Sequence, residues 1–249
     1  MSDPVSFWES FPLWRDALIV SVLSAAVLAY LGVWVTLKRV TYVPLALSQV
    51  SSLGVVAAFL LHQLLDRFIG EHQAIEELCA PAWFSLLFAL ATAFWFARPR
   101  GDSSTSVVVA YLLAGAAVLI LGGFVRQDLH DLQSILFGNA VLVESIQILY
   151  VGVAALLVLG IHLAWYRRFL FVSFDPDSAG ASGIHLFRME VILYFSFALM
   201  ISVATRALGA LPAFGLTILP ALVGLGFAGS MLRAFAIAIG VGIFSAGAA

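Results

Sequence analysis

Two uncharged runs of 26 residues constrain the fold of this chain more than any other feature of its sequence. They cover residues 40–65 and 207–232, and most of their side chains are apolar. About 20 apolar residues in an α-helix cross the hydrocarbon core of a bilayer. A membrane β-barrel would instead show polar and apolar residues alternating over segments of about ten residues. Both runs therefore predict membrane-spanning helices.

Charged residues divide the rest of the chain into further apolar runs of similar kind. These runs cover residues 17–37, 80–97, 107–125, 145–166, 191–205 and 234–249. We predict an all-α fold, a polytopic membrane helix bundle of about eight transmembrane helices that forms one domain over residues 1–249. We expect the first run to be retained, because residues 1–14 contain no Lys or Arg and so lack the basic region of a signal peptide.

The composition excludes most other classes of protein. Hydrophobic residues make up 63% of the chain and charged residues only 10%, whereas soluble domains have about 25% charged residues. The net charge of −2 argues against nucleic acid as a partner and leaves membrane lipids as the surroundings. Cys79 is the one cysteine, which excludes an internal disulfide. We find neither HExxH nor GxSxG, so we predict that the chain is not itself an enzyme.

The loops between the runs predict the orientation in the membrane. Cytoplasmic loops are enriched in Lys and Arg. An extracytoplasmic N-terminus places eight of the twelve basic residues inside, namely Lys38, Arg39, Arg98, Arg100, Arg167, Arg168, Arg188 and Arg233. The opposite orientation reverses this bias. We therefore predict a multi-pass protein with its N-terminus outside.

One cytoplasmic segment, FVSFDPDSAGASGIHLFR, contains the signals of a short helix. Asp175 followed by Pro176 is typical of a helix start, because the carboxylate caps free N–H groups and proline needs none. Asp177 adds negative charge to the first turn, and Gly183 is suited to end the helix. We predict a helix over residues 176–182, which is either a capped connector or a docking element.

Four blocks of the sequence resemble, in order and spacing, the permeases of zinc, manganese and iron ABC importers, the ABC-3 family. Residues 173–185 (SFDPDSAGASGIH) resemble the family's SFDPE-x-A-x-x-x-G, and residues 38–54 (KRVTYVPLALSQVSSLG) resemble its RRM-x-[FY]-x-GDALSHA-x-LPG. Residues 132–144 (LQSILFGNAVLVE) and 206–221 (RALGALPAFGLTILPA) resemble its LFGD and R-x-VG-x-LLV-x-ALLIIPA blocks. The likeness covers roughly residues 15–249.

The resemblance implies a type II ABC importer fold and a subunit in the bacterial inner (plasma) membrane that works with a second copy of itself. Two cytosolic ATPase subunits would bind ATP, and an extracytoplasmic metal-binding protein would deliver the ion. This subunit would bind no cofactor. The helix at residues 176–182 would be the coupling helix that docks on the ATPase, with contributions from Asp175, Pro176, Asp177, Ala179 and Gly183. Relative to the family, the chain is expected to be short at its C-terminal end.

The chain departs from the family at the positions that would bind metal in the membrane. Leu45 and Gln49 stand where the resemblance places an Asp and a His, Asn139 replaces an Asp, and residues 107–114 contain no His. Carboxylate and imidazole groups are the ligands that these cations prefer. We therefore predict no high-affinity metal site along the translocation path, which we place at Leu45, Ser48, Gln49, Ser52 and Pro220.

Two interpretations of these polar and irregular positions remain open. Gln49 either lines the path or makes an interhelical hydrogen bond. The prolines and glycines around Pro220 either mark an irregular helix facing the path or allow close helix packing. At the level of function, the first hypothesis is a permease for a divalent transition metal or its chelate. The alternative is a diverged membrane subunit that transports no ion and acts as a sensor or scaffold for a partner.

Overall fold

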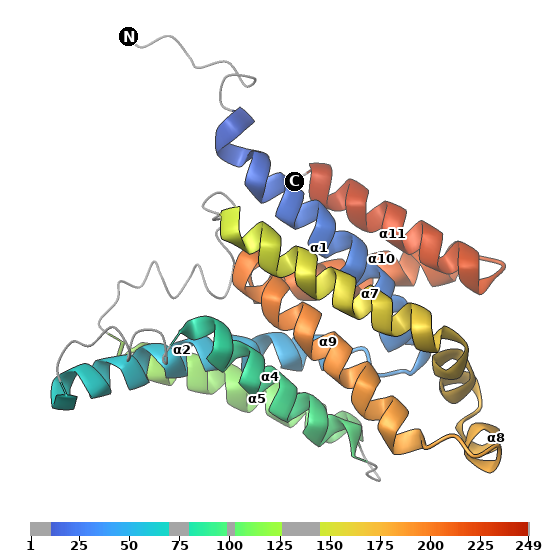
Figure 1. The fold of residues 1–249 in the computed structure, drawn as a ribbon, viewed down its shortest axis with the longest axis horizontal. Helices are drawn as coiled ribbons and strands as arrows, with labels where there is room; N and C mark the ends of the chain where they lie inside the picture. Colours follow the sequence, from blue (N-terminus) through green and yellow to red (C-terminus); the bar gives the residue numbers. More distant parts are fainter. Residues whose placement is uncertain (1–10, 70–79, 99–102, 126–144, 249) are drawn as a thin grey trace.

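Helices make up all the regular structure in the part of the chain that the computed structural model describes, namely residues 11–69, 80–98, 103–125 and 145–248 (Figure 1). Eight of these helices are long and one is short. They are α1 (Phe11–Leu37), α2 (Val43–Ile69), α4 (Pro81–Ala97), α5 (Ser103–Gly122), α7 (Ser145–Phe174), α8 (Pro176–Ala181), α9 (Leu186–Leu208), α10 (Ala210–Phe227) and α11 (Met231–Ala248).

The helices confirm the predicted all-α membrane bundle. Seven of those described are long and apolar enough to cross a membrane, and the eighth long helix, α4, has 17 residues. The run at 145–166 ends beside a kink at Trp165, where the backbone is non-helical, and helix then resumes to Phe174. The run at 207–232 was wrongly predicted as one helix: it contributes to three, because the backbone breaks at Gly209 and again after Phe227.

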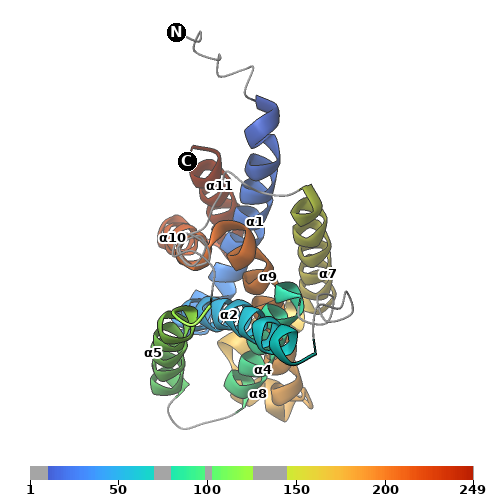
Figure 2. The same cartoon turned by 90° about the vertical axis from the view of Figure 1, so that its left-hand side faces the viewer.

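Helix α9 lies at the centre of the bundle and contacts α1, α2, α4, α7 and α10. On one side of it α1, α10 and α11 pack against one another, and on the other side α2 packs against α4 and α5 (Figures 1 and 2). Helix α10 also reaches α2 and so joins the two groups. Helix α9 therefore contacts both groups, and the contact between α10 and α2 links them a second time.

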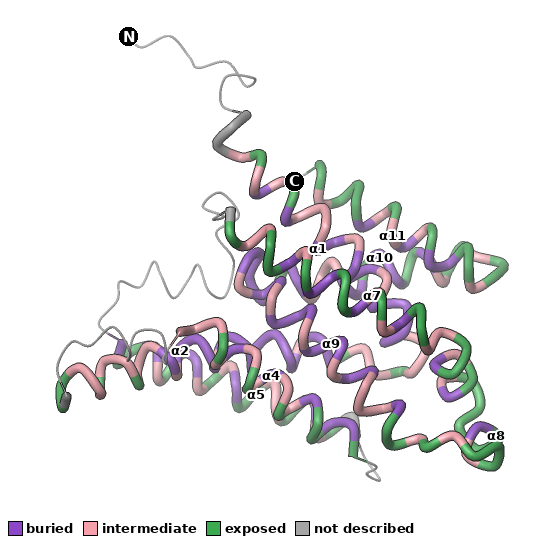
Figure 3. Tube along the Cα trace, viewed as in Figure 1, coloured by how far each residue is buried: buried purple, intermediate pink, exposed green. Residues whose placement is uncertain are grey.

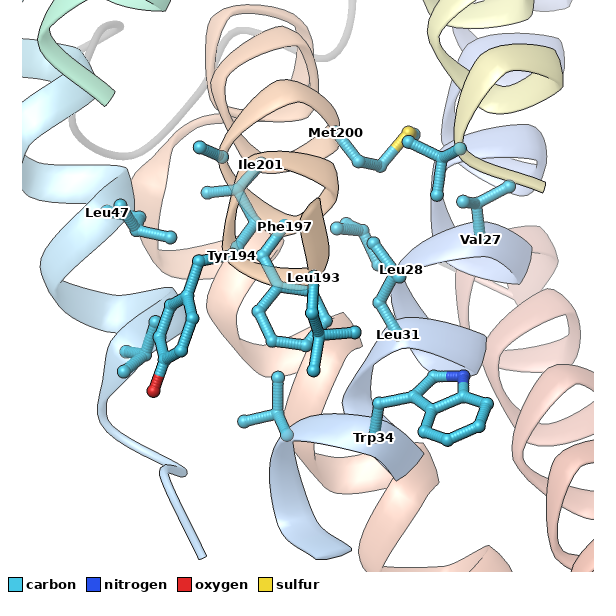
Figure 4. Packing of buried hydrophobic residues seen from close by; sticks show 14 of the residues in the cluster. Val27, Leu28, Leu31, Trp34, Leu47, Leu193, Tyr194, Phe197, Met200 and Ile201 are labelled. Atoms are coloured by element: carbon cyan, nitrogen blue, oxygen red, sulfur yellow. The ribbon is translucent and has the colours of Figure 1, made fainter. Parts of the chain in front are cut away.

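The apolar core surrounds α9. Its side chains Leu193, Phe197 and Met200 are buried beside Leu28 of α1 and Leu47 of α2 (Figure 4). By contrast, exposed residues recur along α7 and α11 (Figure 3). Large apolar side chains are exposed on these helices and on α5, including Leu113, Leu119, Leu156, Leu163 and Phe244. Apolar surface on this scale is typical of helices that face lipid.

Glycines allow several helix pairs to approach closely. A Cβ atom placed on Gly32 of α1 would lie 1.7 Å from the carbonyl oxygen of Thr217 in α10. A Cβ on Gly54 of α2 would lie 2.6 Å from the carbonyl oxygen of Phe84 in α4. Since small residues let backbones approach and pack in membranes, these glycines fix the α1–α10 and α2–α4 contacts.

We expect Gly32→Ala to destabilise the bundle by about 1–3 kcal/mol, because the added methyl group overlaps backbone that cannot move independently. Gly160→Ala in α7 is the matched control, since no atom lies within 4 Å of the place that its added Cβ would occupy. Thermal unfolding of the purified protein in detergent would measure both. Equal melting temperatures for the two variants would contradict the close α1–α10 approach.

Candidate functional site

The short helix α8 forms where the sequence predicts it, one residue shorter at its end. Asp175 is the N-cap, and its Oδ1 accepts a hydrogen bond of 3.0 Å from the backbone N–H of Ser178. At the other end Gly183 has φ +83°, a conformation that favours glycine. There the N–H of Ile184 donates to the carbonyl oxygen of Ala179 at 3.1 Å. Both ends are therefore fixed by local hydrogen bonds.

The two faces of α8 differ in what they contact. Asp177, Ser178 and Ala181 are exposed, whereas Ala179 is fully buried against the body of the protein, where α8 contacts α7 and α9. The structure thus corrects one detail of the sequence prediction. Ala179 seats the helix and does not belong to its exposed face.

A cluster that the sequence did not reveal anchors the α7 segment leading to α8. His162 of α7 is fully buried, and its Nε2 lies 2.8 Å from Oγ of Ser196 on α9. Because Ser196 donates its own hydrogen to the carbonyl oxygen of Leu193, Nε2 must carry the hydrogen in this pair. The His162 ring also contacts those of Tyr30 and Trp34 on α1. The cluster joins α7 to α1 and α9 just before the non-helical backbone at Trp165.

The cap of α8 should depend on pH. Hydrogen bonds from Ser178 lower the pKa of the Asp175 carboxyl, so the ionised form is favoured when the helix is formed. Because its pKa is lower in the folded state, the ionised carboxylate stabilises the start of α8 when the pH is above the ordinary Asp pKa of about 4. This stabilisation is lost as the pH falls through the lowered pKa. We therefore expect hydrogen-exchange protection of the α8 amides, corrected for intrinsic rates, to decrease below about pH 4. In Asp175→Asn, which caps without ionising, the protection should not change with pH.

The residues predicted for the translocation path lie at the start of α2. Ser48, Gln49 and Ser52 are buried, and Leu45 is half-buried. Gln49 is the seventh of the 27 residues of α2. It therefore lies closer to the start of the helix than its position within the run at 40–65 suggests. The difference arises because residues 38–42 form the turn after α1, in which Arg39 adopts φ +58°.

A chain of hydroxyl groups lies on the neighbouring face of α2. Ser51 Oγ donates to Ser202 Oγ of α9 at 3.3 Å, and Ser202 Oγ donates to Ser85 Oγ of α4 at 3.3 Å. All three residues are buried. Ser85 and Ser202 were missed by sequence reasoning, because single serines in apolar runs far apart in the chain give no signal of their meeting.

Gln49 and Ser52 differ from these paired hydroxyls. Gln49 Oε1 and Ser52 Oγ are buried without a hydrogen-bond partner among the described residues. Leaving a buried polar atom unpaired costs about 1–3 kcal/mol, so such atoms are retained where they serve a purpose. Gln49 Oε1 faces α5, where it lies 3.8 Å from the place a Cβ on Gly115 would occupy. The fourth-span position opposite Gln49 is thus a glycine.

Pro220 is buried within α10, a helix that also contacts α2. The helix continues through this proline from Ala210 to Phe227, so the irregularity expected of this span lies at its ends rather than at Pro220. Thr217, one turn earlier, is the residue that meets Gly32 of α1. The structure therefore favours close helix packing around this position, while a role of Pro220 in the path stays a prediction.

The described residues contain no group of three or more His, Cys, Asp or Glu side chains that could hold a metal ion. Asn139 and its block lie outside the described residues. In the turn before α2, Lys38 Nζ forms an ion pair with Glu190 Oε1 of α9. Lys38 is paired and nearly buried, so it offers no free charge to the path.

Comparison with known sequences identifies the family. The sequence model described as the ABC 3 transport family matches residues 10–248. The chain belongs to the ABC 3 transport family. One curated relative is the high-affinity zinc uptake system membrane protein ZnuB of Haemophilus influenzae. It is 25% identical over 85% of this chain and 76% of its own length. The manganese transport system membrane protein MntC of Listeria innocua is 27% identical over 83% of this chain and 69% of its own length.

Two solved structures share the fold of this chain. The structure titled PsaBC from Streptococcus pneumoniae in complex with Fab matches 96% of this chain and 83% of its own chain, with a TM-score of 0.76 and 20% identity. A structure titled an inward-facing conformation of a putative metal-chelate type ABC transporter matches 99% of this chain and 80% of its own chain, with a TM-score of 0.70 and 15% identity. The arrangement of helices around α9 is therefore the fold that these two structures share.

Proposed function

We propose that the chain is the membrane permease subunit of an ABC importer for a divalent transition metal, zinc or manganese, or for its chelate. The observation that supports this most is membership of the ABC 3 transport family over residues 10–248. Curated relatives named for zinc uptake and for manganese transport point to the same substrates. The subunit itself would bind no cofactor, and ATP would bind to its ATPase partner.

The exposed face of α8 would dock on the cytosolic ATPase pair. Asp177, Ser178 and Ala181 are available for contact, and buried Ala179 holds the helix against α7 and α9. Because α9 contacts five of the long helices, movement of α8 would reach both halves of the bundle. A second copy of the chain would complete the transporter, and an extracytoplasmic metal-binding protein would deliver the substrate at the side of the N-terminus.

The path itself would handle its substrate through neutral oxygen atoms. Gln49 Oε1 and Ser52 Oγ are its unpaired polar atoms, and Leu45 adds only an apolar surface. Neutral oxygens do not supply the charge that offsets the dehydration of a bare divalent cation. We infer that the substrate passes either as a chelate or as a weakly held ion.

Co-purification followed by metal analysis tests the proposal. The tagged chain would be purified from its native membrane, and the proteins and metals that co-purify with it would be identified. We expect an ATPase to co-purify, and its activity to rise when the metal-loaded extracytoplasmic protein is added. Recovery of the chain without any ATPase would contradict the proposal.

The replacement of both expected ligands, Leu45 and Gln49, also favours the second candidate, a subunit that senses or scaffolds without transporting. The purified complex can distinguish the two candidates when both its ATPase activity and its metal transport are measured. A complex whose ATPase activity responds to the delivery protein, but which moves no metal across a membrane, is expected only of the sensor or scaffold.

A further inference from the structure

An apolar groove runs along the outer side of α4, where this helix meets α9. Its volume is about 560 Å³, and it is lined by Trp83, Leu87, Leu90 and Phe94 of α4 and by Phe195 of α9, among others. Its walls contain almost no polar atoms. The helix from Trp83 to Phe94, twelve residues, rises about 16 Å, which is about the depth of one leaflet of a bilayer.

Two arginines stand at one end of this groove. The guanidinium of Arg98, just after α4, lies 4.9 Å from the ring centroid of Phe94. Arg188 lies seven residues before Phe195 on α9, a spacing of two turns that places both on the same side of the helix. Phe187, the neighbour of Arg188, lies 6.1 Å from Phe94 between ring centroids and so brings the ends of α4 and α9 together.

Both arginines are exposed, and no carboxylate pairs with either among the described residues. Their positive charge is therefore available to a ligand. The orientation expected from the basic residues places them at the cytoplasmic surface. A long apolar groove with two free cations at its cytoplasmic end matches an acyl chain joined to a negatively charged headgroup.

We propose that this groove is a binding site for one anionic phospholipid of the cytoplasmic leaflet, with an acyl chain between α4 and α9 and the phosphate at Arg98 and Arg188. The site lies partly on α9, the helix that follows α8 in the chain and contacts it. A bound lipid would therefore hold the start of α9 against α4. The binding is independent of transport, so its test is separate from that of the proposed function.

Native mass spectrometry of the full chain, with added phosphatidylglycerol or phosphatidylethanolamine of identical acyl chains, tests the site. We expect phosphatidylglycerol to bind about thirtyfold more tightly, because its headgroup has a net negative charge, toward which each cation contributes about one factor of five to six, whereas the headgroup of phosphatidylethanolamine is neutral overall. The double variant Arg98→Gln, Arg188→Gln should lose this preference. The double variant Arg167→Gln, Arg168→Gln, which removes two exposed arginines of α7, should keep it.

Filling the groove gives an independent measurement. Ala91 is exposed and lines the groove, so Ala91→Trp should block the acyl chain without entering the core and should reduce phosphatidylglycerol binding at least tenfold. Unchanged binding in both Ala91→Trp and the Arg98–Arg188 double variant would overturn the proposal. So would efficient disulfide cross-linking of two chains through Ala91→Cys in a Cys79→Ser background, because a second copy would then cover this face.

Discussion

Replacing Leu45 with Asp and Gln49 with His should create a site for zinc or manganese, for which the described residues provide no group of three or more ligands. The two positions are four residues apart on α2 and share one side of the helix. A carboxylate and an imidazole supply the ligands that a divalent cation prefers, whereas leucine and a neutral amide do not. We expect isothermal titration to show affinity at least about 100-fold higher in the double variant than in the natural chain.

The structure adds a third position to this experiment. Gly115 of α5 faces Gln49, so Gly115→His should bring another imidazole to the same place and tighten binding further. Gln49→Asn is the matched control, because it changes the length of the side chain but adds no ligand of the preferred kind. Tight stoichiometric binding by the natural chain, unaltered in Gln49→Ala, would show that the ligands lie elsewhere.

Ala181→Arg should prevent the delivery protein from stimulating the ATPase. We expect the stimulated rate of ATP hydrolysis to decrease at least about tenfold. Ala181 is exposed at the end of α8, so the substitution leaves the core unchanged and places a large charged side chain on the expected docking face. The rate would be measured for the complex reconstituted in nanodiscs with the metal-loaded delivery protein.

Two further variants separate docking from folding. Ser230→Arg changes an exposed residue in the connection between α10 and α11 and should leave the stimulated rate unchanged. Ala179→Arg places a charge at a fully buried position and should lower the melting temperature of the isolated subunit, which Ala181→Arg should not do. A normal stimulated rate in Ala181→Arg would contradict the docking role of α8.

The sequence was sufficient to predict the class of fold and the local structure of α8. Apolar runs determine which segments span a membrane, and the pair Asp175–Pro176 with Gly183 determines where a short helix begins and ends. The limits of α7 and α10 were harder to predict. After the kink at Trp165, helix resumes past Arg167, where Phe169 and Val172 are buried beyond the charged residues, and a span cut at charges cannot anticipate this.

The site could be predicted only in part, because its remaining features depend on contacts between distant segments. Gln49 was identified from its place in a family-like block, but its approach to Gly115 depends on how α5 packs on α2. Likewise, the meeting of Ser51, Ser85 and Ser202 joins three helices, and the burial of His162 against Ser196 joins two helices far apart in the chain. Hydrophobic periodicity along one helix contains no information about such meetings.

Metal uptake into proteoliposomes tests the central claim most directly. The chain would be reconstituted with its ATPase, and radioactive zinc and manganese would be presented outside on the delivery protein. We predict uptake that requires ATP inside and disappears when the ATP-binding lysine of the ATPase is replaced. The same vesicles lacking this chain should show no uptake. An active, correctly stimulated ATPase without any accumulation of zinc or manganese would contradict the account.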